Sequence, residues 1–331
     1  MTRRLAVGVT WQFDMKREDA IALAKIADES GIDSFWVPEG WSHDAFSLLI
    51  SIAEKTERIK LATGIVNVYS RTPGALAQHF ATLDEWSGGR AIIGLGASSA
   101  NVIEHFHGMR FQPAFARIRE TVDIINMLLR GEKLVYDGKW FRMDRGFTLR
   151  MTPVRPHIPI FIASLNQKST KQTAEIADGW MPVWIPKTAL KDEIDQFRRW
   201  ATAAGRDGTK IEVKSPGGVT VSANPKAVDA GRPMTAYYIA RMGDFYYNHL
   251  SRLGFTDEVA RVRRVFNEQG SEAGAAALSP EFLQEFGVAG DVDTCRRRIE
   301  EQEAAGVDIH SVSIDTKDPV EFGRAVEGLL R

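Results

Sequence analysis

With 331 residues, of which 44% are hydrophobic and 26% charged, the chain has the composition of an ordinary globular protein. A formal net charge of −1 gives no reason to expect nucleic acid or a membrane surface as a partner. The single cysteine cannot form an intramolecular disulfide, and no segment approaches the roughly 18 apolar residues that a membrane-spanning helix needs. Because the first residues also hold too few apolar side chains for a secretory signal, we expect a soluble, cytoplasmic protein.

The first part of the chain alternates between strand-like and helix-like segments. Short β-prone runs are followed by runs whose apolar residues recur at helical spacing. Strands are predicted at 5–11, 32–39, 59–66 and 91–96, and helices at 17–30, 44–57, 73–89 and 115–130. Successive strands are about 28 residues apart, which is the length of a βα unit with a right-handed crossover.

The second part continues this alternation and carries two insertions. Further strands are predicted at 158–164, 179–184, 211–222 and 307–314, and further helices at 167–177, 190–205, 291–305 and 319–330. Eight strands that alternate with helices indicate an α/β protein of the TIM type, a (β/α)8 barrel. We expect one domain over 1–331, with an inserted hairpin near 133–148 that turns at Asp137-Gly138, and a helical insertion near 234–286.

The run GLGASSA at 94–100 has the spacing G-x-G-x-x-A, which also occurs in the phosphate-binding turn of nicotinamide dinucleotide folds. That turn should open the first βα unit and be followed by a strand ending in an acid, and neither condition holds here. Glycines at the end of a barrel strand also let a ligand or the backbone approach closely. Gly94 and Gly96 therefore indicate either a ligand contact or a plain tight turn.

Several stretches together resemble the bacterial-luciferase-like superfamily of barrel oxidoreductases. The specific one is TGIVNVYSRTPGALAQHFATLDEWSGGRAIIGLGAS, and FWVPEGWSHDAFSLL, AEIADGWMPVW and GDVDTCRRRIEEQEAAGVD fit at the expected places. More narrowly, the chain is similar to the branch that uses the deazaflavin coenzyme F420, which includes methylenetetrahydromethanopterin reductases. The resemblance covers nearly the whole chain, and it indicates the class of chemistry better than the substrate.

The resemblance implies a flavin or deazaflavin at the carboxyl ends of the strands, where barrel active sites lie. It implies a non-proline cis peptide bond between Gly64 and Ile65, which would support one face of the tricyclic ring. Such a bond costs about 3–4 kcal/mol and persists only where its surroundings enforce it. Gly96, Ala97 and Ser98 are the residues of the next strand end that the resemblance places at the ring.

The start of the helix after strand five is the expected phosphate site. Free backbone N–H groups and the helix dipole favour an anion there. The residues are Ala163, Ser164, Leu165 and Asn166. Ser164 and Asn166 also suit simple helix N-caps, and the two roles are compatible.

The loop after strand two is where the resemblance places the proton chemistry. Glu39 aligns with an acid of the family, and His43 is of the residue type that titrates nearest neutral pH. Trp41 suits a wall of the substrate pocket, and Trp184 is either a second wall or ordinary barrel packing. Relatives that oxidise sugar phosphates carry a glutamate directly after the glycine turn, where this chain has Ala97, so that substrate class is disfavoured.

We therefore expect hydride transfer between F420 and a small organic substrate of the carbonyl, alcohol or imine type. One alternative is an FMN-dependent luciferase-like monooxygenase, and another is a cofactor-free binding or structural barrel. The resemblance also suggests a homodimer. His105 and His107 lack a third ligand at a matching spacing, so no metal site is predicted.

Overall fold

The computed structural model describes residues 3–9, 15–112, 114–224 and 226–331. The chain divides into two compact units. The N-terminal unit comprises Gly8–Ala163 and Ile176–Gly179, and the C-terminal unit comprises Met1–Val7, Ser164–Glu175 and Trp180–Arg331. Within the described ranges, no helix combines the length and the apolar character needed to cross a membrane.

Four parallel strands form the sheet of the N-terminal unit, in the order β8-β5-β3-β2. They are β2 (Ser34–Val37), β3 (Lys60–Thr63), β5 (Ala91–Gly96) and β8 (Ile160–Ala163), and the short strand β4 (Val66–Asn67) also pairs with β5. The register sets Phe35 beside Leu61 and Leu61 beside Ala91. All three side chains are buried, as expected for parallel strands that are covered on both faces.

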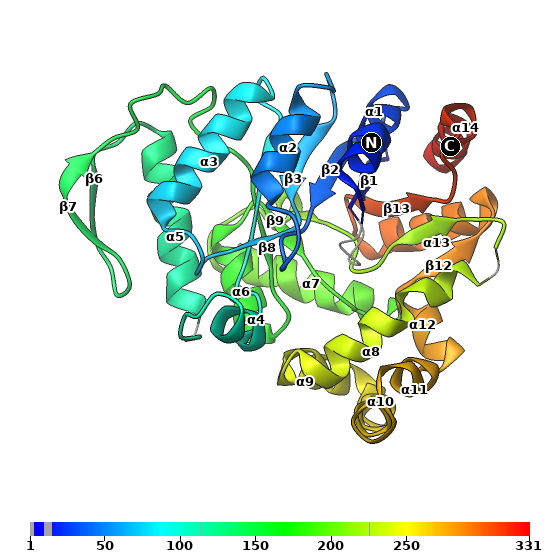
Figure 1. Cartoon of the computed structure of the whole chain (residues 1–331). Helices are drawn as coiled ribbons and strands as arrows, with labels where there is room; N and C mark the ends of the chain where they lie inside the picture. Colours follow the sequence, from blue (N-terminus) through cyan, green and yellow to red (C-terminus); the bar gives the residue numbers. More distant parts are fainter. Residues whose placement is uncertain (1–2, 10–14, 113, 225) are drawn as a thin grey trace. The chain divides into compact units, whose positions relative to one another are not determined.

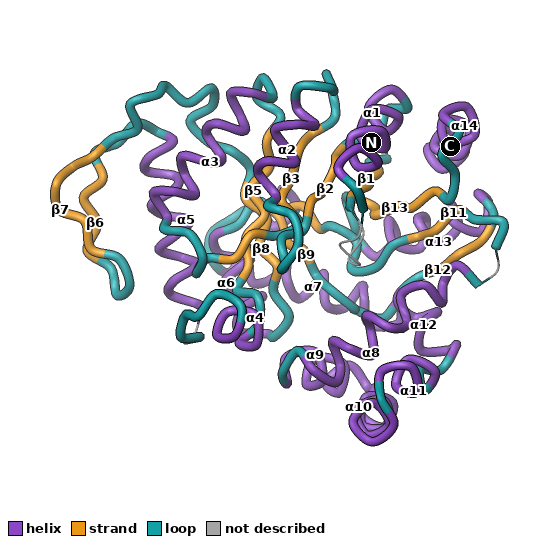
Figure 2. The backbone as a smooth tube through the Cα atoms, viewed as in Figure 1, coloured by secondary structure: helices purple, strands orange, loops and turns teal. Residues whose placement is uncertain are grey.

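The helices of this unit follow the strands in alternation. They are α1 (Arg17–Glu29), α2 (Ala45–Ala53), α3 (Pro73–Trp86), α4 (Ala100–His105) and α5 (Ala114–Leu129). Figures 1 and 2 show α2, α3 and α5 next to one another beside β3 and β5. Asp44 caps α2 by accepting from the N–H of Ser47, and Thr72 caps α3 ahead of Pro73. These are standard helix-start signals, which is why the sequence predicts these helices correctly.

A buried carboxylate joins the end of α1 to the start of β3. Asp28 is 7% exposed and accepts hydrogen bonds of 2.7–2.9 Å from the backbone N–H groups of Glu57, Arg58 and Ile59. Burial by itself would raise the pKa of Asp28, but the three N–H donors outweigh it and lower the pKa below the ordinary value of 3.8.

Asp28→Asn is expected to lower the free energy of unfolding at pH 7 by about 1–2 kcal/mol, because the amide offers one weaker acceptor oxygen in place of a carboxylate. A carboxylate with a depressed folded-state pKa stabilises the protein above its unfolded pKa, and that stabilisation is lost as the pH falls through the folded value. Urea unfolding at several pH values between 7 and 3 tests this. The difference in unfolding free energy between wild type and variant should shrink below about pH 4. A difference that stays constant with pH would contradict a lowered pKa of Asp28.

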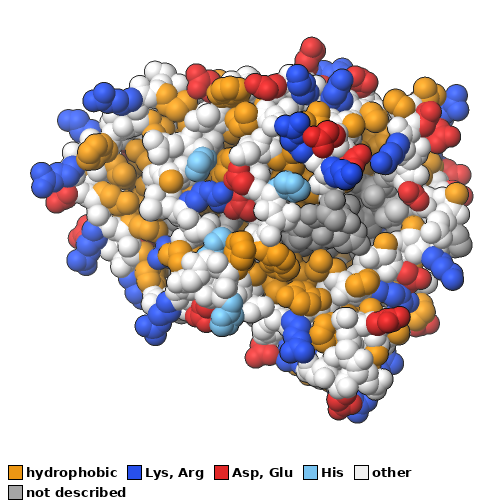
Figure 3. All heavy atoms as spheres, viewed as in Figure 1, with side chains coloured by type: hydrophobic (Ala, Val, Ile, Leu, Met, Phe, Trp, Pro, Cys, Tyr) orange, Lys and Arg blue, Asp and Glu red, His pale blue; other side chains and the backbone are white. Residues whose placement is uncertain are grey.

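An antiparallel hairpin interrupts the alternation after α5. It consists of β6 (Leu134–Asp137) and β7 (Arg142–Phe147). The carboxylate of Glu120 on α5 accepts from the N–H groups of Lys139, Trp140 and Phe141, and so holds the turn. A two-stranded hairpin is only marginally stable alone, so this anchor explains how it persists. Figure 3 shows hydrophobic and basic side chains together over the hairpin, whose Phe147 is 75% exposed.

The C-terminal unit contains a second run of parallel strands, in the order β1-β13-β11-β12. These are β1 (Leu5–Gly8), β13 (His310–Ile314), β11 (Val219–Val221) and β12 (Val288–Gly290), and two further strands are β9 (Gly179–Met181) and β10 (Glu212–Val213). The predicted continuous strand 211–222 is wrong: it is split into β10 and β11. Pro216 has no N–H to donate, and a Cβ on Gly217 would lie 1.8 Å from the carbonyl oxygen of Phe286, so the chain bends there.

Most helices of this unit follow the predicted ranges. The regular barrel helices are α6 (Gln167–Ile176), α7 (Lys187–Ala203), α13 (Val292–Ala305) and α14 (Pro319–Leu330). The helical insertion contains α8 (Arg232–Arg241), α9 (Asp244–Leu250), α10 (Thr256–Gln269), α11 (Ser271–Ala276) and α12 (Pro280–Phe286). These five helices enclose an apolar cluster of their own, which includes Ile239, Val262 and Phe282, and Figure 1 shows α8 to α11 gathered together. The insertion therefore has its own core.

Candidate functional site

Glu39 lies just beyond β2, at the strand ends where barrels of this type bind ligands. Its carboxylate forms a bidentate ion pair with Arg71: Oε1 is 2.5 Å from Nη1, and Oε2 is 3.0 Å from Nη2. The backbone N–H of Ala45 also donates to Oε2 at 3.0 Å. The two side chains are only 10% and 19% exposed. Both carboxylate oxygens of Glu39 are thus held in a fixed geometry as hydrogen-bond acceptors.

Arg71 is the centre of this charged cluster. It also donates to Asp44 Oδ1 at 2.9 Å and lies over the ring of Phe46 at 5.2 Å. Burial works against the charge on Arg71, but its two carboxylate partners outweigh burial and raise its pKa. His79 stacks on the same Phe46 ring, with 4.6 Å between ring centres. Burial, followed by the charge on Arg71, lowers the pKa of His79. The cluster is therefore a preformed cation with its counter-ions beside it.

The predicted cis peptide bond between Gly64 and Ile65 is wrong. The described part of the chain contains no cis peptide bond. The N–H of Gly64 donates to the carbonyl of Val37 at 2.7 Å, and the N–H of Glu39 donates to the carbonyl of Ile65 at 3.1 Å. These bonds continue the pairing of β2 with the chain beyond β3, so the trans backbone is satisfied as it stands.

The two glycines at the end of β5 lie close to different neighbours, one to backbone and the other to a side chain. A Cβ on Gly94 would lie 1.8 Å from the carbonyl oxygen of Thr63, which is backbone and cannot move away. A Cβ on Gly96 would lie 2.8 Å from Cδ1 of Ile65, which is the end of a flexible side chain. Gly94 is therefore required for strand packing, whereas Gly96 leaves room for Ile65 and for whatever approaches it.

Ser98 has a backbone conformation that is unusual for its residue type. Its φ is +60°, and among the described residues only Ser98 and Trp184 are non-glycine residues with positive φ. It is exposed, Ala97 before it is half-buried, and Ser99 after it caps α4 by accepting from the N–H of Val102. Strained residues of this kind cost about 1 kcal/mol or more and cluster at ligand sites. The strain is compatible with a ligand-binding turn, and the contact of this turn with a ring stays a prediction.

Ser98→Gly is expected to raise the free energy of unfolding by up to about 1 kcal/mol, because glycine adopts positive φ without a steric penalty. Ser98→Ala is the matched control, since it removes the hydroxyl and keeps the strained backbone. Urea unfolding of both variants provides the comparison. Equal stability of the glycine and alanine variants would show that no strain is stored at this residue.

The other two predicted residues of the strand-two loop are exposed. Trp41 is 41% exposed, and His43 is exposed with its Nδ1 3.4 Å from the hydroxyl of Ser42. Neither side chain is fixed by the ion pair of Glu39, so the loop presents both to solvent. Their assignment to the pocket wall and to proton transfer remains a prediction.

The predicted phosphate site lies at the start of α6 in the C-terminal unit. Asn166 caps the helix: its Oδ1 accepts from the N–H of Ser169 at 2.9 Å. The hydroxyl of Ser164 instead points into the protein, where it contacts Thr170 at 3.3 Å and Thr173 at 3.1 Å. Leu165 is half-buried. Ala163, which ends β8 in the other unit, is also half-buried. The phosphate assignment therefore rests on the backbone and the dipole at the start of this helix and stays a prediction.

Trp184 follows β9 and has the second strained backbone, with φ of +49°. Its N–H donates to the carbonyl of Pro216 at 3.1 Å. Its ring meets Tyr238 and Tyr246 edge-on, at 5.7 and 5.2 Å between ring centres. Burial raises the pKa of both tyrosines. A bulky residue with positive φ is a true outlier, so Trp184 is held in place by its surroundings rather than by its own preference.

Sequence reasoning missed three features of these strand ends. It did not single out Arg71, although its motif YSRTP lies inside the specific stretch. It also missed Lys214, whose Nζ donates to Ser311 Oγ at 2.5 Å and whose pKa burial lowers to about 8. The third is His249, whose ring nitrogens lie close to the carbonyls of Leu165 and Trp184. Lys214 lies within the predicted strand 211–222, whereas Arg71 and His249 lie among other polar residues. Nothing in the sequence identified the partner of any of the three.

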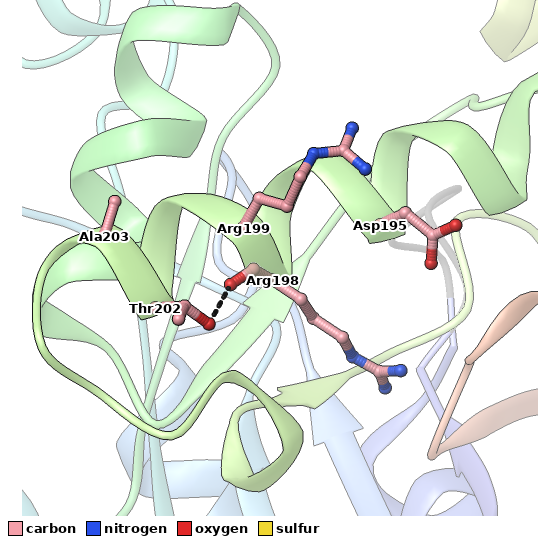
Figure 4. A pocket seen from close by; sticks show the side chains of 5 residues that line it. All are labelled: Asp195, Arg198, Arg199, Thr202 and Ala203. Carbon is pink, nitrogen blue, oxygen red and sulfur yellow. Dashed lines mark hydrogen bonds between the residues drawn. The ribbon is translucent and has the colours of Figure 1, made fainter.

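The surface depression shown in Figure 4 is not part of these strand ends. It lies on α7 and is lined by Asp195, Arg198, Arg199, Thr202 and Ala203. Arg198 donates to the carbonyl of Gly306, Arg199 to Gln196, and Asp195 accepts from Lys191. The later turns of a barrel helix lie toward the amino ends of the strands, where stability rather than catalysis is decided. In the described residues, moreover, no group of three or more His, Cys, Asp or Glu side chains could hold a metal ion.

Solved structures confirm the fold. A coenzyme F420-dependent tetrahydromethanopterin reductase from Methanopyrus kandleri superposes with a TM-score of 0.83 at 23% identity, covering 100% of this chain and 98% of the other. An F420-dependent secondary alcohol dehydrogenase gives a TM-score of 0.80 at 22% identity, covering 100% of both chains. The fold is thus a TIM-type barrel, as the sequence predicts.

Sequence comparison then gives the family. The profile of the luciferase-like monooxygenases matches residues 5–309. A Mycobacterium tuberculosis protein that is provisionally assigned as a coenzyme F420-dependent oxidoreductase is 30% identical over 318 residues, which is 90% of this chain and 91% of that protein. The 5,10-methylenetetrahydromethanopterin reductase of Archaeoglobus fulgidus is 30% identical over 310 residues, 91% of this chain and 90% of the relative. The chain belongs to the luciferase-like monooxygenase family, and it is an oxidoreductase.

Proposed function

We propose that this oxidoreductase uses F420 and transfers a hydride between the deazaflavin and a small organic substrate of the carbonyl, alcohol or imine type. The observation that carries the proposal is the relation to F420-dependent oxidoreductases and methylenetetrahydromethanopterin reductases at 30% identity over nine-tenths of the chain. F420, when bound, supplies or accepts the hydride itself. The protein has to bind the cofactor, orient it and manage a proton.

The N-terminal unit offers residues that suit a flat tricyclic ring. Ile65 fills the space that Gly96 leaves open, and the neighbouring Ser98 is strained in the way that ligand-binding turns often are. An apolar side chain beside an open glycine can support the face of a ring, and backbone at positive φ can present its N–H to the ring edge. Gly64, Ile65, Gly96, Ala97 and Ser98 are therefore kept as the proposed ring-binding residues.

The C-terminal unit offers an anion site that suits the phosphate. α6 has ten residues, and its first-turn N–H groups have no carbonyl partner within the helix. Asn166 accepts from the N–H of Ser169, and the positive end of the helix dipole at this turn favours an anion. We assign Ala163, Ser164, Leu165 and Asn166 to this end of the cofactor, with Ser164 and Leu165 contributing backbone rather than side chain.

Proton management is assigned to the loop after β2. Glu39 is held rigidly by Arg71, so its carboxylate can stabilise positive charge or accept a proton from a substrate atom at a defined place. His43 is exposed on the same loop. In this proposal Glu39 sets the geometry at the reacting atom and His43 connects it to water.

A second candidate function is FMN-dependent oxygenation. The family bears the description luciferase-like monooxygenase, and the FMN complex of the oxygenating component of 3,6-diketocamphane monooxygenase from Pseudomonas putida superposes with a TM-score of 0.68 at 18% identity. An isoalloxazine and a deazaflavin have the same ring outline, so the residues above suit either. The homodimer implied by the family resemblance is likewise part of the proposal.

Paired titrations decide between the two cofactors. Purified protein is titrated with F420 and with FMN while the quenching of tryptophan fluorescence is followed. We expect tight binding of F420 and binding of FMN that is at least about tenfold weaker, a difference of about 1.4 kcal/mol. A preference for FMN would instead support FMN-dependent oxygenation. Binding of neither would reject both.

A further inference from the structure

His249 connects three parts of the C-terminal unit that are far apart in the sequence. It lies on α9 in the helical insertion and is 5% exposed. Its Nδ1 is 3.1 Å from the carbonyl oxygen of Leu165, in the turn before α6. Its Nε2 is 3.0 Å from the carbonyl oxygen of Val183 and 3.2 Å from that of Trp184, in the loop after β9. One imidazole therefore touches the proposed phosphate turn and the strained pocket residue.

The chemistry of imidazole makes this arrangement sensitive to protonation. A carbonyl oxygen can only accept a hydrogen bond, and a neutral imidazole has one N–H and one unprotonated nitrogen. In the neutral form, one ring nitrogen thus faces a carbonyl oxygen without a proton between them. Only the imidazolium donates on both sides at once. The observed distances on both sides suit that doubly donating form.

The groups around His249 shift its pKa in opposite directions. Burial lowers its pKa from the ordinary value of 6.5, and the positive charge of Arg252 adds to this, while the carbonyls of Val183 and Trp184 and the negative charge of Glu193 oppose it. Arg252 and Glu193 are themselves paired at 2.6 Å, so their charges largely cancel. The net effect is a pKa below the ordinary value, so burial favours the neutral ring and protonation requires a lower pH than for an exposed histidine.

We propose that His249 is a positioning residue that ties the helical insertion to the turn before α6 and to the loop after β9, holding both when it is protonated and one when it is neutral. The link to the cofactor rests on the proposed function, since the turn at Leu165 is the proposed phosphate site. Protonation also places a positive charge beside that turn. Cofactor affinity therefore increases as the pH falls through the pKa of His249.

Three variants and one control test the proposal. His249→Ala removes both contacts, His249→Asn keeps a donor near Nδ1, and His249→Gln keeps a donor near Nε2. His310→Asn is the control: it is a buried histidine of the same unit, 1% exposed, whose Nδ1 contacts Gln302 at 2.9 Å. F420 affinity of each protein is measured by fluorescence quenching at pH 5.5 to 8, and thermal unfolding shows which variants are folded.

Wild type and His310→Asn should bind F420 at least about fivefold more tightly at pH 5.5 than at pH 8. His249→Ala should bind about tenfold more weakly at low pH, and the affinities of all three His249 variants should be independent of pH. A pH dependence in the asparagine or glutamine variant that equals the wild-type dependence would overturn the proposal. So would unchanged affinity of the alanine variant.

Amide hydrogen exchange of the ligand-free protein separates this inference from the proposed function. At one fixed pH near 5.5, His249→Ala should speed exchange in segments 164–168 and 183–186 at least about tenfold relative to wild type, because opening there becomes easier. His310→Asn should leave both segments unchanged. If wild type binds no F420 yet the alanine variant shows this local loosening, the function fails and the positioning role stands. Unchanged exchange in both segments overturns the role whatever the cofactor.

Discussion

Gly96→Val is expected to weaken F420 binding by about 100-fold, or about 2.7 kcal/mol, while the barrel stays folded. The first added carbon would lie 2.8 Å from the end of the Ile65 side chain, which can rotate away. Valine and the displaced Ile65 would then fill the space proposed for the ring. Fluorescence titration measures the affinity, and circular dichroism with thermal unfolding measures the fold.

Two other glycines provide contrasts for Gly96. Gly94→Ala puts a carbon 1.8 Å from the carbonyl oxygen of Thr63 and is expected to prevent folding, because backbone in a sheet cannot yield. Gly74→Ala meets no neighbouring group within 4 Å and should leave binding as in wild type, with stability unchanged or higher by up to about 1 kcal/mol because alanine favours the helix. Wild-type affinity in Gly96→Val would remove the β5 turn from the cofactor site. Unfolding of Gly96→Val would show that its role is packing, like that of Gly94.

Glu39→Gln is expected to lower kcat by about 100-fold or more and to change the Kd of F420 by less than about threefold. The amide keeps the shape of the side chain, but it cannot accept a proton at neutral pH and pairs poorly with Arg71. Because the ion pair is partly solvent-accessible, its loss should cost no more than about 1–3 kcal/mol of folding free energy. Steady-state kinetics with the substrate found by screening, together with F420 titration, checks the split.

Asp44→Asn is the matched control for Glu39→Gln. Asp44 also contacts Arg71, but its side chain is 43% exposed and lies on the solvent side of the cluster. It should keep kcat within about threefold of wild type. Equal losses of kcat in the two variants would mean that Arg71 orientation, and not the Glu39 carboxylate, controls the rate. An unaltered rate in Glu39→Gln would remove Glu39 from the mechanism.

Local patterns in the sequence determined the elements and the fold class. The apolar run at 91–96 is β5 to the residue, and Pro73 begins α3 as predicted. Such signals are local, since a strand or a helix start depends on residues within one or two turns of each other. Regular spacing of the first four strands, and continued alternation of strands and helices after them, then leave few topologies other than a barrel. The stretches that resemble the luciferase-like superfamily predicted the family and the class of chemistry.

The tertiary structure alone decided how the candidate residues are used. Glu39 and Arg71 are 32 positions apart, and His249 contacts carbonyls 65 to 84 positions away. No local pattern encodes a partner at such a distance, because it depends on how whole elements pack. The trans bond at Gly64-Ile65 and the break between β10 and β11 have the same origin. These conformations are decided by backbone hydrogen bonds to neighbouring strands and by the close approach of Phe286. The local sequence at each position does not decide them.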